Sequence, residues 1–163
     1  MHFSERYRYK PVREIIQKES MDDALKNKLW SILFIQIFEK YSSYDRYKEL
    51  FSPLIIKIWI DLLKLPLDEK PSSYKFTMFM KDYLYRSEWF TFYDVIEFII
   101  QNKTGNTLFG NITAYNQNNL INAINNALET ENSSYRVINQ QIIEITSEQE
   151  IQSIEDALAN TNP

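Results

Sequence analysis

The sequence predicts a mainly α-helical, bundle-like domain that ends in one small β-hairpin and a terminal helix. Glycine is scarce, with two residues in 163, whereas an all-β fold needs many glycine-rich turns. Apolar residues recur every three to four positions over most of the chain up to residue 130, as amphipathic helices require. Around residues 135–145 the apolar period changes to that of a strand pair.

Length and composition favour a single domain over residues 1–163. Hydrophobic residues make up 44 % of the chain, which excludes a disordered protein. The chain has no cysteine, so disulfides and thiolate metal sites are excluded, and we expect no cofactor. The net charge of −4 is too small to dictate a partner.

The first part of the chain is expected to hold an extended arm and two helices. Residues 1–10 form the arm, and Pro11 suits the first position of a short helix, VREIIQ. Ser20 and Asp23 resemble a capping box that opens a longer helix ending near Lys40. The apolar positions of this helix recur at helical spacing and are Leu25, Leu29, Ile32, Leu33 and Ile37.

A second start signal lies at Ser52 and Pro53, with serine as the cap and proline at the first helical position. The run LIIKIWIDLLK follows and is apolar almost all round, which predicts a central, buried helix. Asp61 and the lysines in this run therefore need a route to solvent or a partner. A loop bracketed by Pro66 and Pro71 comes next.

Two further helices are expected before an irregular stretch. Residues 72–73 can cap a helix over residues 74–85, and Ser87 can cap another over residues 88–101. The inward positions of the second helix are Phe92, Val95, Ile96, Ile99 and Ile100. Residues 102–112, NKTGNTLFGNI, are the best candidate for a loop.

The last part of the chain predicts a helix, a hairpin and a terminal helix. The helix runs to about Thr130, and its apolar positions are Leu120, Ile121, Ile124 and Leu128. Strands over residues 135–138 and 142–145 flank a short polar turn. The terminal helix covers residues 147–159 and carries one narrow apolar stripe, Ile151, Ile154 and Leu158. This stripe suits an interface, either with the domain's own core or, as a connector, with a domain beyond residue 163.

The two ends of the chain carry opposite charge. Residues 6–18 carry five cations against one carboxylate, and residues 129–156 carry seven carboxylates against one arginine. The two ends could attract each other, or each could serve a different partner.

The basic arm is the most suggestive local pattern. Its cations are Arg6, Arg8, Lys10 and Arg13, and its tyrosines are Tyr7 and Tyr9. In an extended arm, alternating cations and tyrosines project to opposite sides, which suits phosphates on one side and stacked bases on the other. The more common alternative is an arm whose tyrosines pack on the domain while its cations stay in water or meet the acidic end.

Catalytic patterns are weak. His2 is the only histidine and lies in the arm, so neither a Ser-His-Asp site nor a His-ligated zinc site is supported. Gly105 and Gly110 have the spacing of a phosphate-binding loop, but no Lys-Ser/Thr pair follows them.

Two features of the stretch before residue 101 leave alternatives open. Asp94 and Glu97 lie one helical turn apart and could hold a metal or a proton, although a solvated pair or a contact with Arg86 is more common. The aromatic stretch over residues 83–93 could line a ligand pocket, although packing in a core or interface is the more common role.

Residues 3–30 resemble the opening of the AbiJ N-terminal domains, and more narrowly that of the fourth type. The matching pieces are FSER at 3–6, IQ at 16–17, ESM at 19–21 and LKNKLW at 25–30. The run ENSSYRVINQQIIEITSEQEIQSIEDAL, residues 131–158, is similar to the closing part of the same domain. Two positions depart from the pattern: Arg8 stands where a small residue is typical, and Asn139-Gln140 stands where an Asn-Gly-like turn is typical.

The resemblance implies a bacterial abortive-infection protein with a toxin-like, antiphage role. In that family the domain stands before a HEPN domain, a helical module that commonly acts as a ribonuclease. The HEPN signature is an arginine followed by a histidine, and here His2 precedes every arginine. We therefore expect a fragment of a longer protein that serves as a non-catalytic sensor, regulator or assembly domain, with the HEPN domain as its partner. A weak RNA contact and a homodimer stay open, and the trigger is not specified.

The expected location is the bacterial cytoplasm, without membrane contact. The first ten residues contain no apolar core of the signal-peptide type. The most apolar run, residues 53–67, is interrupted by Lys57, Asp61 and Lys64 and is too short to span a bilayer.

Overall fold

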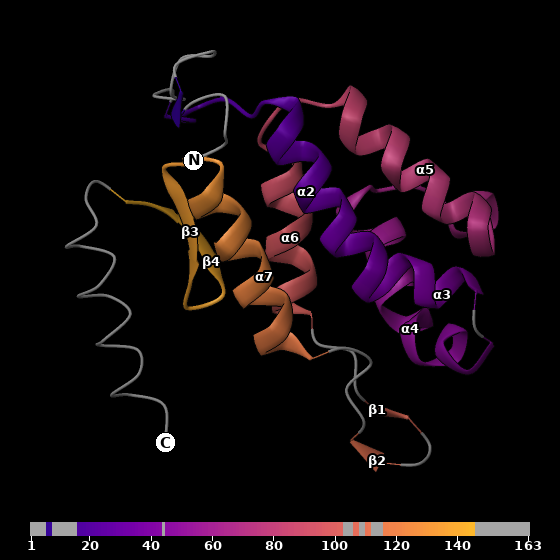
Figure 1. Cartoon of the computed structure of the whole chain (residues 1–163). Coiled ribbons are helices and arrows are strands. Elements are labelled where there is room, and N and C mark those ends of the chain that lie inside the picture. The colour runs from indigo at the N-terminus through magenta and orange to yellow at the C-terminus, as the bar shows by residue number, and fades with distance from the viewer. Residues whose placement is uncertain are drawn as a thin grey trace.

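A computed structural model of the protein describes residues 6–7, 16–43, 45–102, 106–107, 110–111 and 116–145. Within these ranges the chain is mainly helical, with a small antiparallel hairpin near its C-terminal end, which confirms the predicted fold class (Figure 1). The predicted terminal helix, residues 147–159, lies outside the described residues, as does most of the predicted arm. Gln17, expected in a short helix, instead forms a β-bridge with Ser133.

The first long helix is continuous over three segments. These are α2 (Asp23–Leu33), the π-helical segment η1 (Phe34–Phe38) and α3 (Glu39–Ser43). Its N-cap is Asp22, not Ser20, because the Asp22 side chain accepts a hydrogen bond from the Leu25 N–H at 2.9 Å. The Asp22 N–H in turn donates to the Gln17 side chain at 2.8 Å. A contact distant from the capping pattern therefore sets where the helix begins.

The predicted helix start at Ser52 and Pro53 is wrong. The helix α4 (Asp45–Lys57) begins earlier, and Pro53 lies inside it on an exposed position. The Ser52 hydroxyl donates to the Lys48 carbonyl at 2.6 Å instead of capping a new helix. Phe51 is fully buried just before Pro53, so burial of the upstream turn outweighs the local cost of proline.

The helix that follows Pro53 is also less buried than predicted. α4 continues into a second π-helical segment, η2 (Ile58–Leu62). Ile58 and Trp59 are buried, whereas Ile56 and Ile60 are exposed. Asp61 is exposed as well, so it reaches solvent directly and needs no buried partner. The helix therefore lies on the surface of the bundle with one apolar face inward.

The next helices match the predicted spans except at one cap. A 3₁₀ turn, η3 (Leu67–Glu69), interrupts the loop before α5 (Ser73–Arg86) and α6 (Thr91–Gln101). Ser87 ends α5 and does not begin α6, because its hydroxyl donates to the Tyr83 carbonyl at 2.5 Å. The five predicted inward residues of α6 are all fully buried: Phe92, Val95, Ile96, Ile99 and Ile100.

The stretch predicted as a loop contains a short strand pair, β1 (Asn106–Thr107) and β2 (Gly110–Asn111). The helix α7 (Gln117–Thr130) follows and ends where the sequence predicts. Asn132 adopts a positive φ of 57° beyond its end. This conformation lets the Ser133 N–H reach the Leu128 carbonyl at 2.8 Å, as in a Schellman motif.

The hairpin consists of β3 (Tyr135–Ile138) and β4 (Gln141–Glu144). Side chains of the flanking helices form hydrogen bonds with backbone groups at both edges of the hairpin. On β3, the Asn125 side chain accepts from the Val137 N–H at 2.7 Å and donates to the Val137 carbonyl at 3.0 Å. On β4, Glu97 accepts from the Ile142 N–H at 2.7 Å. These contacts fix the hairpin against α6 and α7 and block pairing with further strands.

We expect Gln140→Gly to raise the free energy of unfolding by about 1 kcal/mol. The turn contains only Asn139 and Gln140, with φ of 53° and 63°, and a glutamine pays a steric cost there that glycine avoids. Urea denaturation measures the change. Gln141→Gly is the matched control, because Gln141 is the first strand residue and should lose stability. Equal effects of the two changes would contradict the account of the turn.

The core lies between the helices. α2 packs against α7, and α3 packs against α4 and α5, while α6 contacts η2 and the hairpin. Aromatic rings fill the centre, with Trp30 stacked on Phe38 at a centroid distance of 5.5 Å. None of the helices in the described ranges has the length and apolar character needed to cross a membrane.

Candidate functional site

The segment that enters α2 and the residues around the hairpin meet at one place. Residues 16–18 run beside the start of the hairpin, where the Gln17 N–H donates to the Asn132 carbonyl at 2.8 Å. The Ser134 N–H donates to the Gln17 carbonyl at 3.0 Å, and the Ile145 N–H donates to the Ser134 carbonyl at 2.8 Å. Ser134 therefore joins the segment that enters α2 to the segment that leaves β4. We call residues 16–18, 131–136 and 144–145 the junction.

Gln17 is the centre of the junction, a role that its place in the matching piece IQ at 16–17 does not indicate. Its side chain is 2 % exposed. The Gln17 Nε2 donates to the Glu131 carbonyl at 2.7 Å, and its Oε1 accepts from the Asp22 N–H at 2.8 Å. One side chain thus connects the N-terminal segment, the start of α2 and the end of α7.

Within the described residues, one ion pair joins the oppositely charged ends and a second joins α2 to the end of α7. Lys18 Nζ lies 3.1 Å from Glu144 Oε1, and Lys28 Nζ lies 2.7 Å from Glu131 Oε2. The hydrogen bond and the charge of Glu144 raise the pKa of Lys18 above its usual value. Lys18 ends the basic N-terminal region and Glu144 belongs to the acidic C-terminal one. The basic N-terminal region and the acidic C-terminal region therefore attract each other where Lys18 meets Glu144.

Arg136 is a buried cation in the junction, with 6 % of the residue exposed. Its Nη1 donates to the Ser133 carbonyl at 2.9 Å and to the Tyr135 carbonyl at 2.7 Å. No salt bridge joins it to a carboxylate of the described residues. Among the described residues, backbone carbonyls are the partners that hold this buried guanidinium.

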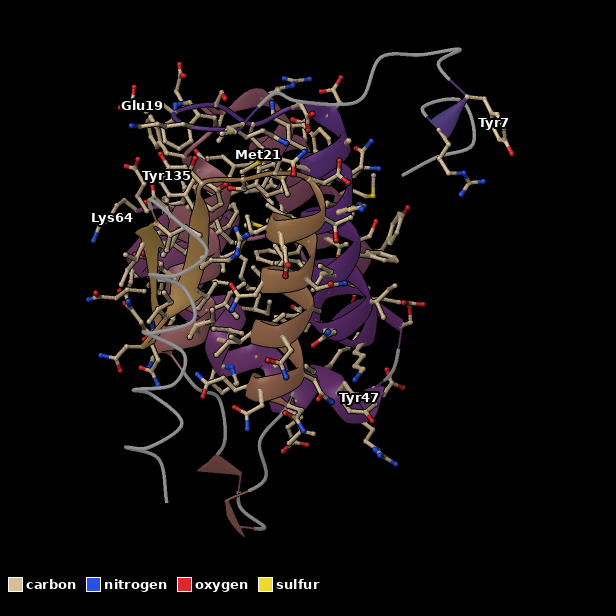
Figure 2. The ribbon with its side chains drawn as sticks, turned by 60° about the vertical axis from the view of Figure 1, so that its left-hand side comes forward. Tyr7, Glu19, Met21, Tyr47, Lys64 and Tyr135 are labelled. Carbon is tan, nitrogen blue, oxygen red and sulfur yellow. The ribbon has the colours of Figure 1, made fainter. Side chains whose placement is uncertain are left out.

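The aromatic stretch over residues 83–93 packs against the junction. Trp89 and Tyr93 meet edge to face with centroids 6.0 Å apart, and Tyr93 lies 5.2 Å from Tyr135. The Tyr135 hydroxyl accepts from the Glu19 N–H at 3.2 Å, and Figure 2 shows these two residues close together at the end of the molecule. The aromatic side chains thus serve packing at the point where the ends meet.

We expect the ionisation of Tyr93 to lower the free energy of unfolding by about 2 to 3 kcal/mol between about pH 10 and about pH 12. Burial raises the pKa of Tyr93 from 10.0 to about 12, so the unfolded state releases this proton first. The stabilisation is complete below the unfolded pKa and is lost as pH approaches the folded one. Urea titrations at about pH 9 and about pH 11.5 compare the protein with Tyr93→Phe, which should lose less stability. An identical loss in both proteins would rule out this role for Tyr93.

Asp94 and Glu97 do not form a paired site. The Glu97 carboxylate accepts a hydrogen bond from the Ile142 N–H of β4. The Asp94 residue is exposed on α6, and the limited burial of its carboxyl group raises the pKa of Asp94. Arg86, the suggested partner, pairs with Asp82 at 2.9 Å. Across the part of the chain that the structure describes, no three His, Cys, Asp or Glu side chains gather as metal ligands. His2 and Gly105 lie outside the described residues.

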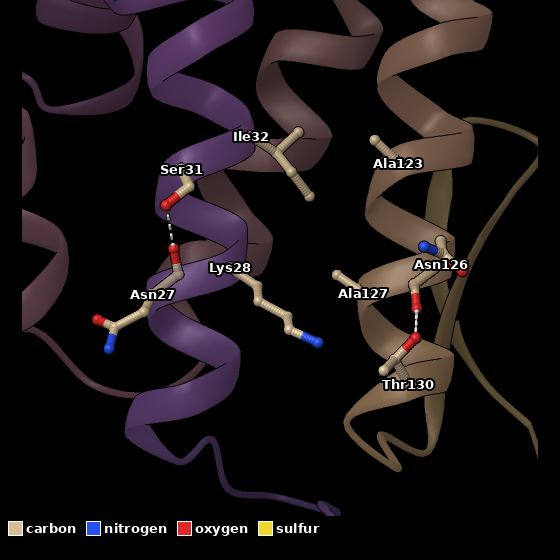
Figure 3. A pocket seen from close by; sticks show the side chains of 8 residues that line it. All are labelled: Asn27, Lys28, Ser31, Ile32, Ala123, Asn126, Ala127 and Thr130. Atoms are coloured by element: carbon tan, nitrogen blue, oxygen red, sulfur yellow. Dashed lines mark hydrogen bonds between the residues drawn. The ribbon is translucent and has the colours of Figure 1, made fainter. Parts of the chain in front are cut away.

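A surface pocket of about 450 Å³ lies between α2 and α7 (Figure 3). Its lining residues are Asn27, Lys28, Ser31, Ile32, Ala123, Asn126, Ala127 and Thr130. The hydroxyls of Ser31 and Thr130 donate to carbonyls of their own helices at 2.7 Å, as the dashed lines in Figure 3 show. Lys28 is paired with Glu131. The strongest donors of the pocket are already in use, which makes it a poor site for a polar ligand.

Of the predicted arm residues, the structure describes Arg6 and Tyr7 alone. Both are exposed, and Tyr7 is 63 % exposed. Figure 2 places Tyr7 well away from Tyr135 and the hairpin. Arg8, Tyr9, Lys10 and Arg13 lie outside the described residues, as do Ile151, Ile154 and Leu158.

Comparison with known proteins gives one match. A family model described as AbiJ N-terminal domain 4 matches residues 1–160. No curated protein matches the chain, and no solved structure matches it.

Proposed function

The chain belongs to the AbiJ N-terminal domain 4 family, which is associated with abortive-infection proteins, and from this premise we propose that it is a non-catalytic sensor or assembly domain. The observation that carries the proposal is the junction. Two backbone hydrogen bonds, from Ser134 to Gln17 and from Ile145 to Ser134, connect the segment that enters α2 to the residue that follows β4. A partner that displaces residues 16–18 would therefore act on the end of the hairpin.

The effector in this proposal is a HEPN ribonuclease domain that lies outside these 163 residues. The arginine-to-histidine signature of such a domain cannot occur here, because His2 precedes every arginine. Asp94 and Glu97, the best carboxylate pair in the sequence, serve different purposes in the fold. The domain would restrain or position the effector in the bacterial cytoplasm and respond to a phage or host signal.

Expression of the 163-residue chain alone in bacterial cells tests this proposal. We expect the protein to accumulate in folded form and growth to continue as in cells with an empty vector. The Phe76→Ala variant, which loses a fully buried ring, controls for the burden of making an unfolded protein. Growth arrest caused by the folded protein and not by the variant would contradict a non-catalytic role.

A second candidate function is nucleic-acid binding by the arm. The observation in its favour is that Arg6 and Tyr7 are both exposed, so their side chains are accessible to phosphate and base. In this case RNA binding should weaken steeply with salt and disappear in Arg6→Ala/Arg8→Ala. A Lys75→Ala/Lys81→Ala variant, which removes two exposed cations of α5, is the matched control. Absence of binding at low salt would remove this candidate.

A further inference from the structure

An exposed isoleucine lies next to the surface pocket between α2 and α7. Ile35 belongs to η1, four residues after Ser31 of the pocket wall, so it points to the same side of the continuous helix as Ser31. Its side chain is 59 % exposed. A single exposed isoleucine is common on protein surfaces, so the pocket beside it is what makes this one informative. A protruding apolar side chain and a recess lie together on one face, which we call the α2–α7 face.

The floor of the recess is apolar. Ile32, Ala123 and Ala127 point toward one another from the two helices, as Figure 3 shows. The two alanines leave space that larger side chains would fill, and the pocket has a volume of about 450 Å³. The charge of Lys28 at its edge is balanced by Glu131, 2.7 Å away. An apolar side chain from another molecule therefore fits this recess better than a charged one.

The α2–α7 face is also nearly free of charge. Residues 29–38, which form the last part of α2 and all of η1, contain no charged side chain, and Glu129 is the only one in α7. Charged residues make up 25 % of the whole chain, so this depletion distinguishes the face from the rest of the sequence. The centres of protein interfaces are depleted of charge in the same way.

We propose that the α2–α7 face binds a second copy of the chain. Two observations favour a copy over a different partner. A two-fold axis brings equivalent residues of the two copies close together, so like charges would repel on any face that carried them, and each chain has a net charge of −4. The protruding isoleucine and the recess also lie on the same face, which is the condition for a closed, self-complementary dimer.

The spacing along the helix suits such a dimer. A two-fold axis that is perpendicular to α2 and level with Ile32 places Ile35 of each copy over the pocket of the other. The seven residues from Lys28 to Ile35 span about 10 Å along the helix, so both contacts fit in one interface. The exposed amide of Asn126 lies at the rim and can both donate and accept a hydrogen bond across the interface. This inference uses the α2–α7 face alone and does not depend on the proposed sensor role.

Analytical ultracentrifugation of the 163-residue chain, from about 1 to about 200 µM, tests the proposal. We expect a reversible equilibrium between monomer and dimer. Ile35→Ser should raise the dissociation constant about a hundredfold, because the dimer loses two buried isoleucines at once. Met78→Ser is the matched control, since Met78 is 40 % exposed on a different helix, α5, and should leave the constant unchanged. Circular dichroism and urea denaturation confirm that both variants are folded.

Engineered cysteines test the arrangement of the two copies, because the protein has no cysteine of its own. A mixture of Ile35→Cys and Asn126→Cys chains should form disulfide-linked heterodimers at least about tenfold faster than a control mixture, since docking raises the effective concentration of the two thiols. The control mixture combines Met78→Cys chains with Asn126→Cys chains, and Met78 and Asn126 are both exposed.

The outcomes separate the alternatives. A dimer that weakens in Ile35→Ser and not in Met78→Ser, with fast disulfides between positions 35 and 126, supports the proposal. A chain that stays monomeric at every concentration would overturn it, because the face would then serve a different occupant. A dimer that Ile35→Ser leaves unchanged, or equal disulfide rates in the two mixtures, would also overturn it, because the copies would then meet at another surface.

Discussion

Replacing Phe76 with alanine is expected to lower the free energy of unfolding by about 3 to 5 kcal/mol. Phe76 on α5 is fully buried at the centre of the aromatic core. Its ring lies 5.9 Å from that of Tyr41, edge to face, and 6.2 Å from those of Phe38 and Trp59. These rings come from three other helical segments and cannot all close around the space that the missing ring leaves.

Tyr74→Ala is the matched control for this change. Tyr74 lies two residues earlier on the same helix and is 59 % exposed, so its loss should change stability by no more than about 0.5 kcal/mol. Urea denaturation followed by circular dichroism measures both. A loss below about 1 kcal/mol for Phe76→Ala would mean that the aromatic core is not packed as described.

Replacing Gln17 with alanine is expected to cost about 2 to 4 kcal/mol, which is large for a polar residue. The change removes two side-chain hydrogen bonds, to the Asp22 N–H and the Glu131 carbonyl, in a position that is 2 % exposed. Both backbone groups lose that partner, and removing one member of a buried hydrogen bond costs more than the bond contributes. Protection of the α2 and β3 amides should fall together, because Gln17 connects their ends.

Gln101→Ala controls for the loss of a glutamine side chain. Gln101 is exposed and donates one hydrogen bond, to the Gln140 carbonyl at 3.0 Å, so the expected cost is about 0.5 kcal/mol or less. Gln17→Glu separates the two bonds, because it keeps the acceptor for Asp22 and removes the donor for Glu131. If Gln17→Ala and Gln101→Ala cost the same, the junction does not depend on Gln17.

Much of the fold could be predicted because the buried residues recur at the regular spacing of a helix or a strand. In α6 the apolar residues recur at helical spacing, and all five predicted inward residues are buried. The end of α7 and the hairpin followed from the change of period after Thr130. Local patterns sufficed where one face of an element is buried and the other is in water.

Local patterns failed where distant contacts decide the outcome. Pro53 looked like the start of a helix, but the burial of Phe51 carries the helix through it. Ser87 looked like an N-cap, but its hydroxyl bonds back to Tyr83. The π-helical segments η1 and η2 left no recognisable signal, because one extra residue per turn hardly alters an apolar pattern this dense.

The site was harder to predict than the fold. The opposite charges of the two ends were visible in the sequence, and the Lys18–Glu144 pair shows where they meet. Gln17 was expected at the end of a short helix and lies in a matching piece of the family resemblance, but neither observation indicates a buried side chain that connects α2 and α7. Glu97 was a candidate for metal binding or proton transfer, yet its carboxylate serves as the edge partner of β4.

The most direct test of the account is whether the purified chain cleaves RNA. Total bacterial RNA is incubated with the full 163-residue protein, with Mg²⁺ and with Mn²⁺, and analysed on a denaturing gel. The double variant Asp94→Asn/Glu97→Gln, purified in the same way, controls for contaminating nucleases. The account predicts intact RNA with both proteins, as expected of a sensor or assembly domain. Cleavage by the protein that is absent from the double variant would contradict it and would make the domain itself an enzyme.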